Sequence, residues 1–254
     1  MQLVTVGRWR ATGEDLYREV ADLTEAKGGT ELFVLGCGSG ITAEWLAART
    51  GAAVTGVDPD PERISQAEAR RREAAEGIVT FEVTPLDDLP HETAVFDAAV
   101  AEPEVAAARD PARALAELVR VTKPLGRVVA LLPTWTSEID SGDREDLVQR
   151  LGLRPQLLVE WKQMLRAAGL VDLVVQDWSD GGPSSGARTP ESAMPALTWR
   201  QKAQITGRAW RRRGWRAARG AVRRELELLE DLSRERALGF QLVMGVKWPH
   251  PRGG

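Results

Sequence analysis

The sequence predicts an α/β fold built around a doubly wound, Rossmann-like sheet. Short apolar runs of strand length alternate with helical stretches along most of the chain, which is the pattern of parallel βαβ units. A glycine-rich turn follows the first apolar run and opens the next helix, where sheets of this kind bind ligands. With 254 residues, the chain suits one globular domain, or one domain with a sizeable insertion.

Glycine and proline mark the boundaries of the predicted elements. Asp60 and Asp110 each precede a proline, so each is predicted to cap a helix whose first residue is that proline. The predicted strands are residues 31–35, 53–57, 79–84, 96–101, 127–132, 171–178 and 238–247. The predicted helices are residues 13–26, 41–49, 61–75, 112–121, 157–168 and a long region over 198–236.

Composition argues against several classes of protein. The chain is 43% hydrophobic with a net charge of −3, which does not suit a disordered protein. No uncharged apolar run reaches the roughly 18 residues of a membrane-spanning helix, and the first residues lack the order of a secretory signal. One cysteine, Cys37, and two histidines, His91 and His250, argue against a structural disulfide or a zinc site. We therefore expect a cytoplasmic protein with no metal and no membrane partner.

The strongest motif is the glycine turn formed by Gly36–Gly40. Glycines at alternate positions let the backbone approach a ligand closely, and the following helix offers free N–H groups at its start. Asp58 ends the second predicted strand, where a carboxylate can accept both hydroxyl hydrogens of a ribose. The spacing does not exclude a dinucleotide site, because the pattern counted from Gly38 ends in Ala43, a tolerated variant.

With these residues, the sequence resembles the class I S-adenosylmethionine-dependent methyltransferases, in particular those that act on small molecules. Further segments match in the order of the family, namely 84–90, 95–100, 118–127 and 164–170. The resemblance implies a seven-stranded sheet whose last strand is antiparallel to the rest. It divides the chain into a cofactor-binding core over 1–178, a loop and helical lid over 179–237, and a last strand with a tail over 238–254.

The resemblance also assigns roles to individual residues. Asp58 would hold the ribose hydroxyls of S-adenosylmethionine, Leu86 would offer its backbone N–H to the adenine, and Asp87 would lie at the adenine edge. The full set of implied cofactor-binding residues is Gly36, Cys37, Gly38, Ser39, Gly40, Asp58, Pro59, Leu86, Asp87 and Glu102. Two positions depart from the family pattern, in which Val34 and Pro85 would be acidic residues. Because of these departures, a further alternative is a protein that binds the cofactor without catalysing a reaction.

Methyl transfer from a sulfonium is a direct displacement with a neutral leaving group. The protein therefore mainly aligns the reactants and excludes water, and a hydroxyl or amine acceptor also needs a base. Glu102 follows the fourth predicted strand, where the family often places a residue that faces the methionine or the substrate, so it is the catalytic candidate. His91 is a weaker candidate, because its position in a turn favours a solvated loop histidine.

The last third of the chain bears on the methyl acceptor. Residues 199–224 contain ten Lys or Arg and no Asp or Glu. We interpret them as a lid helix with a solvated basic face. The alternative is an RNA or DNA methyltransferase that binds phosphate groups with this face. Nine tryptophans, with Trp135 and Trp161 expected near the cleft mouth, predict an apolar or aromatic small-molecule acceptor, although packing alone also explains them. The sequence does not fix the oligomeric state.

Overall fold

The computed structural model describes residues 14–74, 79–136, 144, 145, 148, 152–179 and 238–249. The strands are β1 (Glu31–Leu35), β2 (Ala53–Asp58), β3 (Val79–Val83), β4 (Phe96–Ala101), β5 (Thr122–Trp135), β6 (Gln156–Leu157), β7 (Leu170–Asp177) and β8 (Leu238–Lys247). The helices are α2 (Glu14–Thr24), α3 (Ile41–Thr50), α4 (Pro61–Ala74), the 3₁₀ helix η2 (Pro103–Ala107), α5 (Pro111–Val121) and α7 (Leu158–Ala167).

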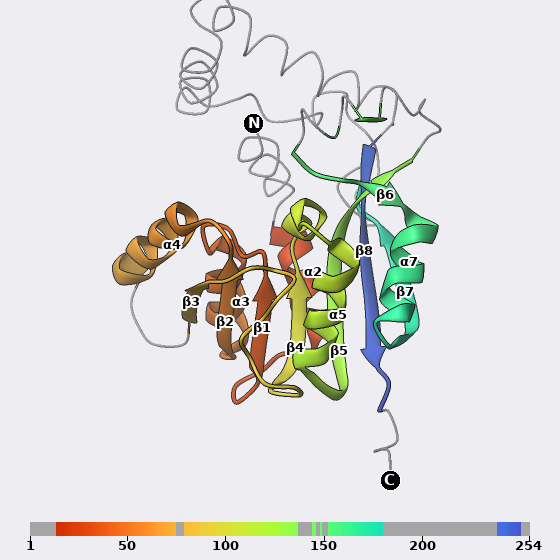
Figure 1. The fold of residues 1–254 in the computed structure, drawn as a ribbon. Helices are drawn as coiled ribbons and strands as arrows, with labels where there is room; N and C mark the ends of the chain where they lie inside the picture. Colours follow the sequence, from red (N-terminus) through yellow and green to blue (C-terminus); the bar gives the residue numbers. More distant parts are fainter. Residues whose placement is uncertain are drawn as a thin grey trace, which may run out of the picture.

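The strands form one sheet in the order β3-β2-β1-β4-β5-β8-β7, with β6 paired to β5 (Figure 1). The pairs from β3 to β5 are parallel, whereas β8 runs antiparallel to both β5 and β7. The chain reverses its direction of travel across the sheet between β1 and β4, which is the switch point of a doubly wound fold. The predicted fold and the antiparallel last strand are confirmed, and the two-residue β6 adds an eighth strand to the predicted seven.

Helices cover both faces of the sheet, and β1 shows why the core has two halves. Leu32 and Val34 pack in a cluster with residues of α2, α3 and α4, whereas Phe33 and Leu35 pack in a second cluster with residues of η2, α5 and α7. Successive strand residues point to opposite faces, so a strand buried on both sides has to be apolar throughout. This burial holds the glycine turn rigidly at the end of β1.

The predicted boundaries are confirmed where a local capping interaction sets them. Asp60 Oδ1 accepts a hydrogen bond from Glu62 N at 2.9 Å, and Asp110 Oδ1 accepts one from Arg113 N at 3.0 Å. The start of β5 differs from the prediction. Thr122 pairs with Phe96 before the register shifts, so the predicted break at Pro124–Gly126 is a bulge inside the strand.

Several expectations fall on residues outside the described part of the chain. The lid predicted over 179–237 lies outside it except for Ser179, and the basic tract 199–224 lies outside it completely. Among the described helices, none combines the length and the apolar character that crossing a membrane requires.

Candidate functional site

The glycine turn lies at the carboxyl end of β1 in a backbone conformation that favours glycine. Its three glycines, Gly36, Gly38 and Gly40, have φ angles of 73°, 54° and 81°. The N–H groups of Gly36 and Cys37 both donate to the Val57 carbonyl, at 2.8 and 2.9 Å. The turn is therefore fixed to the end of the neighbouring strand β2, where Asp58 follows Val57.

Asp58 is fully buried, and backbone N–H groups orient its carboxylate. Oδ2 accepts from Gly38 N and Oδ1 accepts from Asp60 N, each at 2.9 Å. Charge-assisted hydrogen bonds of this kind hold a buried carboxylate in one orientation. The structure thus places Asp58 directly against the glycine turn, as the sequence predicted.

A cavity of about 300 Å³ opens beside Asp58. Three segments form its walls: the end of β2 with the first turn of α4, the loop after β3, and η2 with the residues that follow it. Its lining residues are Asp58, Pro59, Asp60, Arg63, Pro85, Leu86, Asp87, Glu104, Ala107, Ala108 and Arg109. The structure therefore brings together four predicted cofactor-binding residues, Asp58, Pro59, Leu86 and Asp87.

The other six predicted site residues do not line this cavity, namely Gly36, Cys37, Gly38, Ser39, Gly40 and Glu102. The Cys37 side chain is fully buried in the core cluster beside α3, so only its backbone faces the turn. Glu102 does not line the cavity, but its N–H donates to the Leu35 carbonyl at 2.9 Å. This hydrogen bond places Glu102, which is 5% exposed, next to the start of the glycine turn.

Sequence reasoning missed Arg63 and Glu104. Arg63 Nη1 lies 3.5 Å from Asp58 Oδ2 and 3.3 Å from Glu104 Oε1, so one guanidinium joins two buried carboxylates. Glu104 also packs tightly on the turn, because a Cβ added to Gly36 would lie 2.7 Å from Glu104 Cβ. Their positions offered a weak clue, since Arg63 follows Asp58 by five residues and Glu104 follows Glu102 by two.

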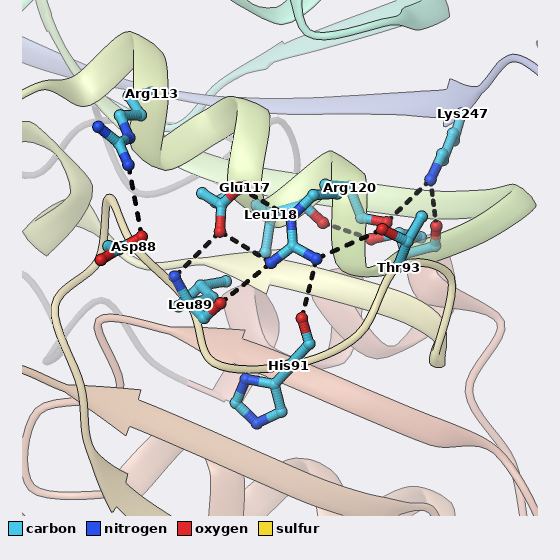
Figure 2. Close-up of polar contacts among 10 residues, drawn as sticks. Asp88, Leu89, His91, Thr93, Arg113, Glu117, Leu118, Arg120 and Lys247 are labelled. Carbon is cyan, nitrogen blue, oxygen red and sulfur yellow. Dashed lines mark hydrogen bonds and ion pairs between the residues drawn. The ribbon is translucent and has the colours of Figure 1, made fainter.

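Side chains of α5 hold the loop that carries Leu86 and Asp87 (Figure 2). Glu117 Oε2 accepts from Leu89 N at 2.9 Å, and Arg120 donates to the carbonyls of Leu89 and His91 at 3.1 and 2.8 Å. The Arg120 hydrogen bond lowers the pKa of Glu117, and the Glu117 hydrogen bond raises the pKa of Arg120. This pair fixes the loop immediately after its cavity-lining residues.

The structure corrects the interpretation of His91 as a solvated loop histidine. Its side chain is 14% exposed and lies 3.4 Å from Glu82 through Nε2. The ring packs against Phe33 and Phe96, with centroid separations of 5.1 and 5.4 Å. It points away from the Arg120 contacts (Figure 2) and does not line the cavity. His91 is therefore a packing residue of the loop.

Two tryptophans that were expected near the cleft mouth, Trp135 and Trp161, lie in the core instead. Trp135 is 4% exposed and Trp161 is fully buried, and both belong to the core cluster under α5 and α7. Trp161 Nε1 donates to the Pro133 carbonyl at 2.9 Å, so its polar atom is satisfied inside the protein. For these two residues the packing explanation holds.

Comparisons with known proteins agree on the kind of domain. Residues 33–130 match the model of the family described as "Methyltransferase domain". The methyltransferase GfsG of Streptomyces halstedii is 30% identical over 117 residues, which are 46% of this chain and 42% of that protein. The chloroplastic tocopherol O-methyltransferase of Arabidopsis thaliana is 25% identical over 219 residues, 80% of this chain and 59% of that protein. The chain spans only 36% to 44% of the length of the first four curated relatives.

Solved structures show the same fold. The Haemonchus contortus phosphoethanolamine N-methyltransferase 2, in complex with phosphomonomethylethanolamine and S-adenosylhomocysteine, superposes with a TM-score of 0.71 at 17% sequence identity. The superposition covers 93% of this chain and 53% of that protein.

The described site fits S-adenosylmethionine, the cofactor of this domain family. The cavity volume of about 300 Å³ is at the low end of small-molecule sites, which suits the nucleoside half of the cofactor. Asp58 provides an oriented acceptor for hydroxyl groups, and Leu86 provides an apolar wall. Residues 33–130 therefore match a methyltransferase domain, and the described strands and helices have the fold of solved methyltransferases.

Proposed function

We propose that this protein is a methyltransferase that transfers a methyl group from S-adenosylmethionine to a small-molecule acceptor by direct displacement. The observation that carries the proposal is the cavity that buried Asp58 lines together with Leu86, where Asp58 also accepts a hydrogen bond from the glycine turn. When bound, the cofactor supplies an electrophilic methyl group on a sulfonium. The chain's own contribution is to bind, to orient and to exclude water.

The residues around the cavity divide these tasks. Asp58 would accept hydrogen bonds from the ribose hydroxyls, because its oxygens are already oriented by Gly38 and Asp60. Leu86 and Asp87 would bound the adenine, and Pro59, which lines the cavity beside Asp58, would lie against the ribose. Backbone groups of the glycine turn, those of Cys37 and Ser39 included, would lie along the amino-acid side of the cofactor.

Glu102 is our candidate for the base that removes a proton from a hydroxyl or amine acceptor. Its backbone is fixed between the glycine turn and η2, because its N–H donates to Leu35 and its carbonyl accepts from Val105 N at 3.0 Å. Glu102→Gln keeps the size of the side chain and removes its basicity. We expect it to lower turnover about 10²- to 10⁴-fold for an acceptor that must lose a proton. Equal turnover by wild type and variant would show that Glu102 is not the base.

The acceptor that we propose is apolar or aromatic. Support comes from the tocopherol O-methyltransferase, whose match covers 80% of this chain and so extends well beyond the cofactor-binding domain. An acceptor panel of phenols, prenylated quinols, thiols and amines, with release of S-adenosylhomocysteine as the readout, tests this proposal. Turnover only with amines would overturn it. We further propose a cytoplasmic location.

Calorimetry of Asp58→Ala tests the site itself. Loss of a charged acceptor for two hydroxyl groups costs about 1.5–3 kcal/mol per hydrogen bond, so we expect affinity for S-adenosylhomocysteine to fall at least tenfold. Asp22→Ala is the matched control, because it removes one carboxylate from an exposed position on α2. If Asp58→Ala binds as tightly as the control, the cofactor does not lie in this cavity.

A further inference from the structure

The Arg63 side chain reaches across the glycine turn. Its Nη1 atom lies 3.5 Å from Asp58 Oδ2 at the end of β2 and 3.3 Å from Glu104 Oε1 in η2. β1 lies between β2 and β4 in the sheet, and η2 follows β4, so a side chain that joins these carboxylates passes over the turn after β1. Arg63 is 7% exposed, and the carboxylates of Asp58 and Glu104 belong to residues that are 0% and 5% exposed. All three charges therefore lie within the protein and beside the cavity.

In the proposed cofactor site, Arg63 and a ribose would compete for Asp58. A carboxylate oxygen offers two lone pairs. Those of Oδ2 receive the Gly38 N–H at 2.9 Å and the Arg63 guanidinium at 3.5 Å. A ribose hydroxyl that binds to this oxygen has to displace the guanidinium, and the longer of the two contacts is the easier one to break.

Displaced from Asp58, Arg63 keeps partners on the wall of the cavity. Glu104 lies within reach of Nη1, and Asp60 Oδ2 lies 3.7 Å from Nε. The positive charge therefore stays beside the cofactor. Its field acts on any second cation in the cavity, because charges near a protein surface interact appreciably over several ångströms.

We infer that Arg63 sets the selectivity of the cofactor site between S-adenosylmethionine and S-adenosylhomocysteine. This inference rests on the proposed function, because it takes the cavity to be the cofactor site. The two molecules differ by the positive charge of the sulfonium. Asp58 and Glu104 attract that charge and Arg63 offsets the attraction, so Arg63 limits how strongly the site prefers the methyl donor over its neutral product.

Isothermal titration calorimetry with both molecules tests the inference. Arg63→Met keeps a long unbranched side chain and removes the charge. We expect it to tighten the binding of S-adenosylhomocysteine, because the competitor for Asp58 is gone, and to tighten that of S-adenosylmethionine by a further factor of about three to ten. Arg71→Met is the matched control on the same helix, since Arg71 pairs with Glu68 on α4, away from the cavity, and its binding should match wild type.

Glu104→Gln provides a second test with the opposite sign. It removes a negative charge and leaves Arg63 in place, so we expect the preference for S-adenosylmethionine over S-adenosylhomocysteine to fall below that of wild type. Weaker binding of both molecules by Arg63→Met would show that Arg63 is a binding group and would overturn the inference. An unchanged preference in both variants would overturn it as well. If the wild-type protein does not bind S-adenosylhomocysteine, the assignment of the cavity as the cofactor site is refuted, and the inference about Arg63 is refuted with it.

Discussion

Arg120 fixes the loop between β3 and β4, and we predict that Arg120→Met loosens this loop and weakens adenine binding. Its guanidinium donates to the Leu89 and His91 carbonyls and to both oxygens of Glu117, with distances between 2.8 and 3.1 Å (Figure 2). Hydrogen bonds to charged groups contribute about 1.5–3 kcal/mol each, and partial exposure lets water replace some of them. We expect the free energy of unfolding to fall by about 3 kcal/mol in total.

Urea denaturation measures this loss, and Arg113→Met is its control. Arg113 lies on the same helix and pairs with Asp88 of the same loop at 3.3 Å, but the two side chains are 61% and 79% exposed. An exposed pair contributes little, so we expect the control to change stability by less than about 1 kcal/mol. For both variants the dependence of stability on urea concentration should stay unchanged, because the surface exposed on unfolding is the same.

Ligand binding separates a loop that positions the adenine from one that only adds stability. The loop carries Leu86 and Asp87 on the cavity wall, three and two residues before the fixed Leu89. We expect Arg120→Met to weaken S-adenosylhomocysteine binding about threefold to tenfold, and to leave unchanged the binding of S-ribosylhomocysteine, which lacks adenine. Equal losses for both ligands, or none for either, would refute the positioning role. Equal destabilisation by Arg120→Met and Arg113→Met would refute the energetic argument.

The pH dependence of stability follows from the Glu117–Arg120 pair. The Arg120 hydrogen bond lowers the pKa of Glu117 from its ordinary value of 4.5. A carboxyl with a lowered pKa in the folded state stabilises the protein above its unfolded pKa, and this contribution is lost as the pH falls through the folded pKa. The stability difference between wild type and Glu117→Gln should therefore be constant at neutral pH and shrink below about pH 4.5. A difference that persists into acid would contradict this assignment.

Two further predictions concern the core around the site. Gly40→Ala should destabilise the protein by about 2–5 kcal/mol, because φ is 81° and the new Cβ would lie 2.5 Å from Phe81 Cζ. Thermal unfolding checks it against Gly28→Ala, whose Cβ would meet nothing within 4 Å. Trp161→Phe should cost about 1–3 kcal/mol by leaving the buried Pro133 carbonyl without its indole donor, with acceptor affinity unchanged. A changed KM for the acceptor in Trp161→Phe would instead show that Trp161 contributes to the acceptor site.

The fold was predictable because local residues, such as glycine, proline and helix-capping side chains, set where most strands and helices begin and end. β1 and β4 begin and end at the predicted residues, since each is a short apolar run bounded by turns or loops. The strand β6 was not predicted, because a two-residue strand has no periodicity and exists only through its pairing with Thr134 and Trp135. The predicted beginning of β5 was wrong for a related reason. Thr122 joins the strand by pairing with Phe96, which no pattern around Pro124 reveals.

The site was predictable where its residues are neighbours in sequence or end consecutive strands. The glycine turn and Asp58 are such residues, because β1 and β2 are adjacent and parallel. Arg63 and Glu104 were missed because they are 41 residues apart and meet only through the sheet order. Trp161 was misplaced because a sequence gives the helix but not the direction in which its first turn faces.

The charge around the turn also has a consequence for the chemical step. Asp58, Glu102 and Glu104 are all at most 5% exposed, and Arg63 contacts two of them. Methyl transfer removes the positive charge of the sulfonium as the reaction proceeds. An excess of negative charge there stabilises the reactant more than the transition state, and binding of that kind lowers KM while it slows the step. Arg63→Met should therefore slow single-turnover methyl transfer to an acceptor found in the panel, while it tightens S-adenosylmethionine binding. A rate equal to that of Arg71→Met would show that the charge of Arg63 acts on binding alone.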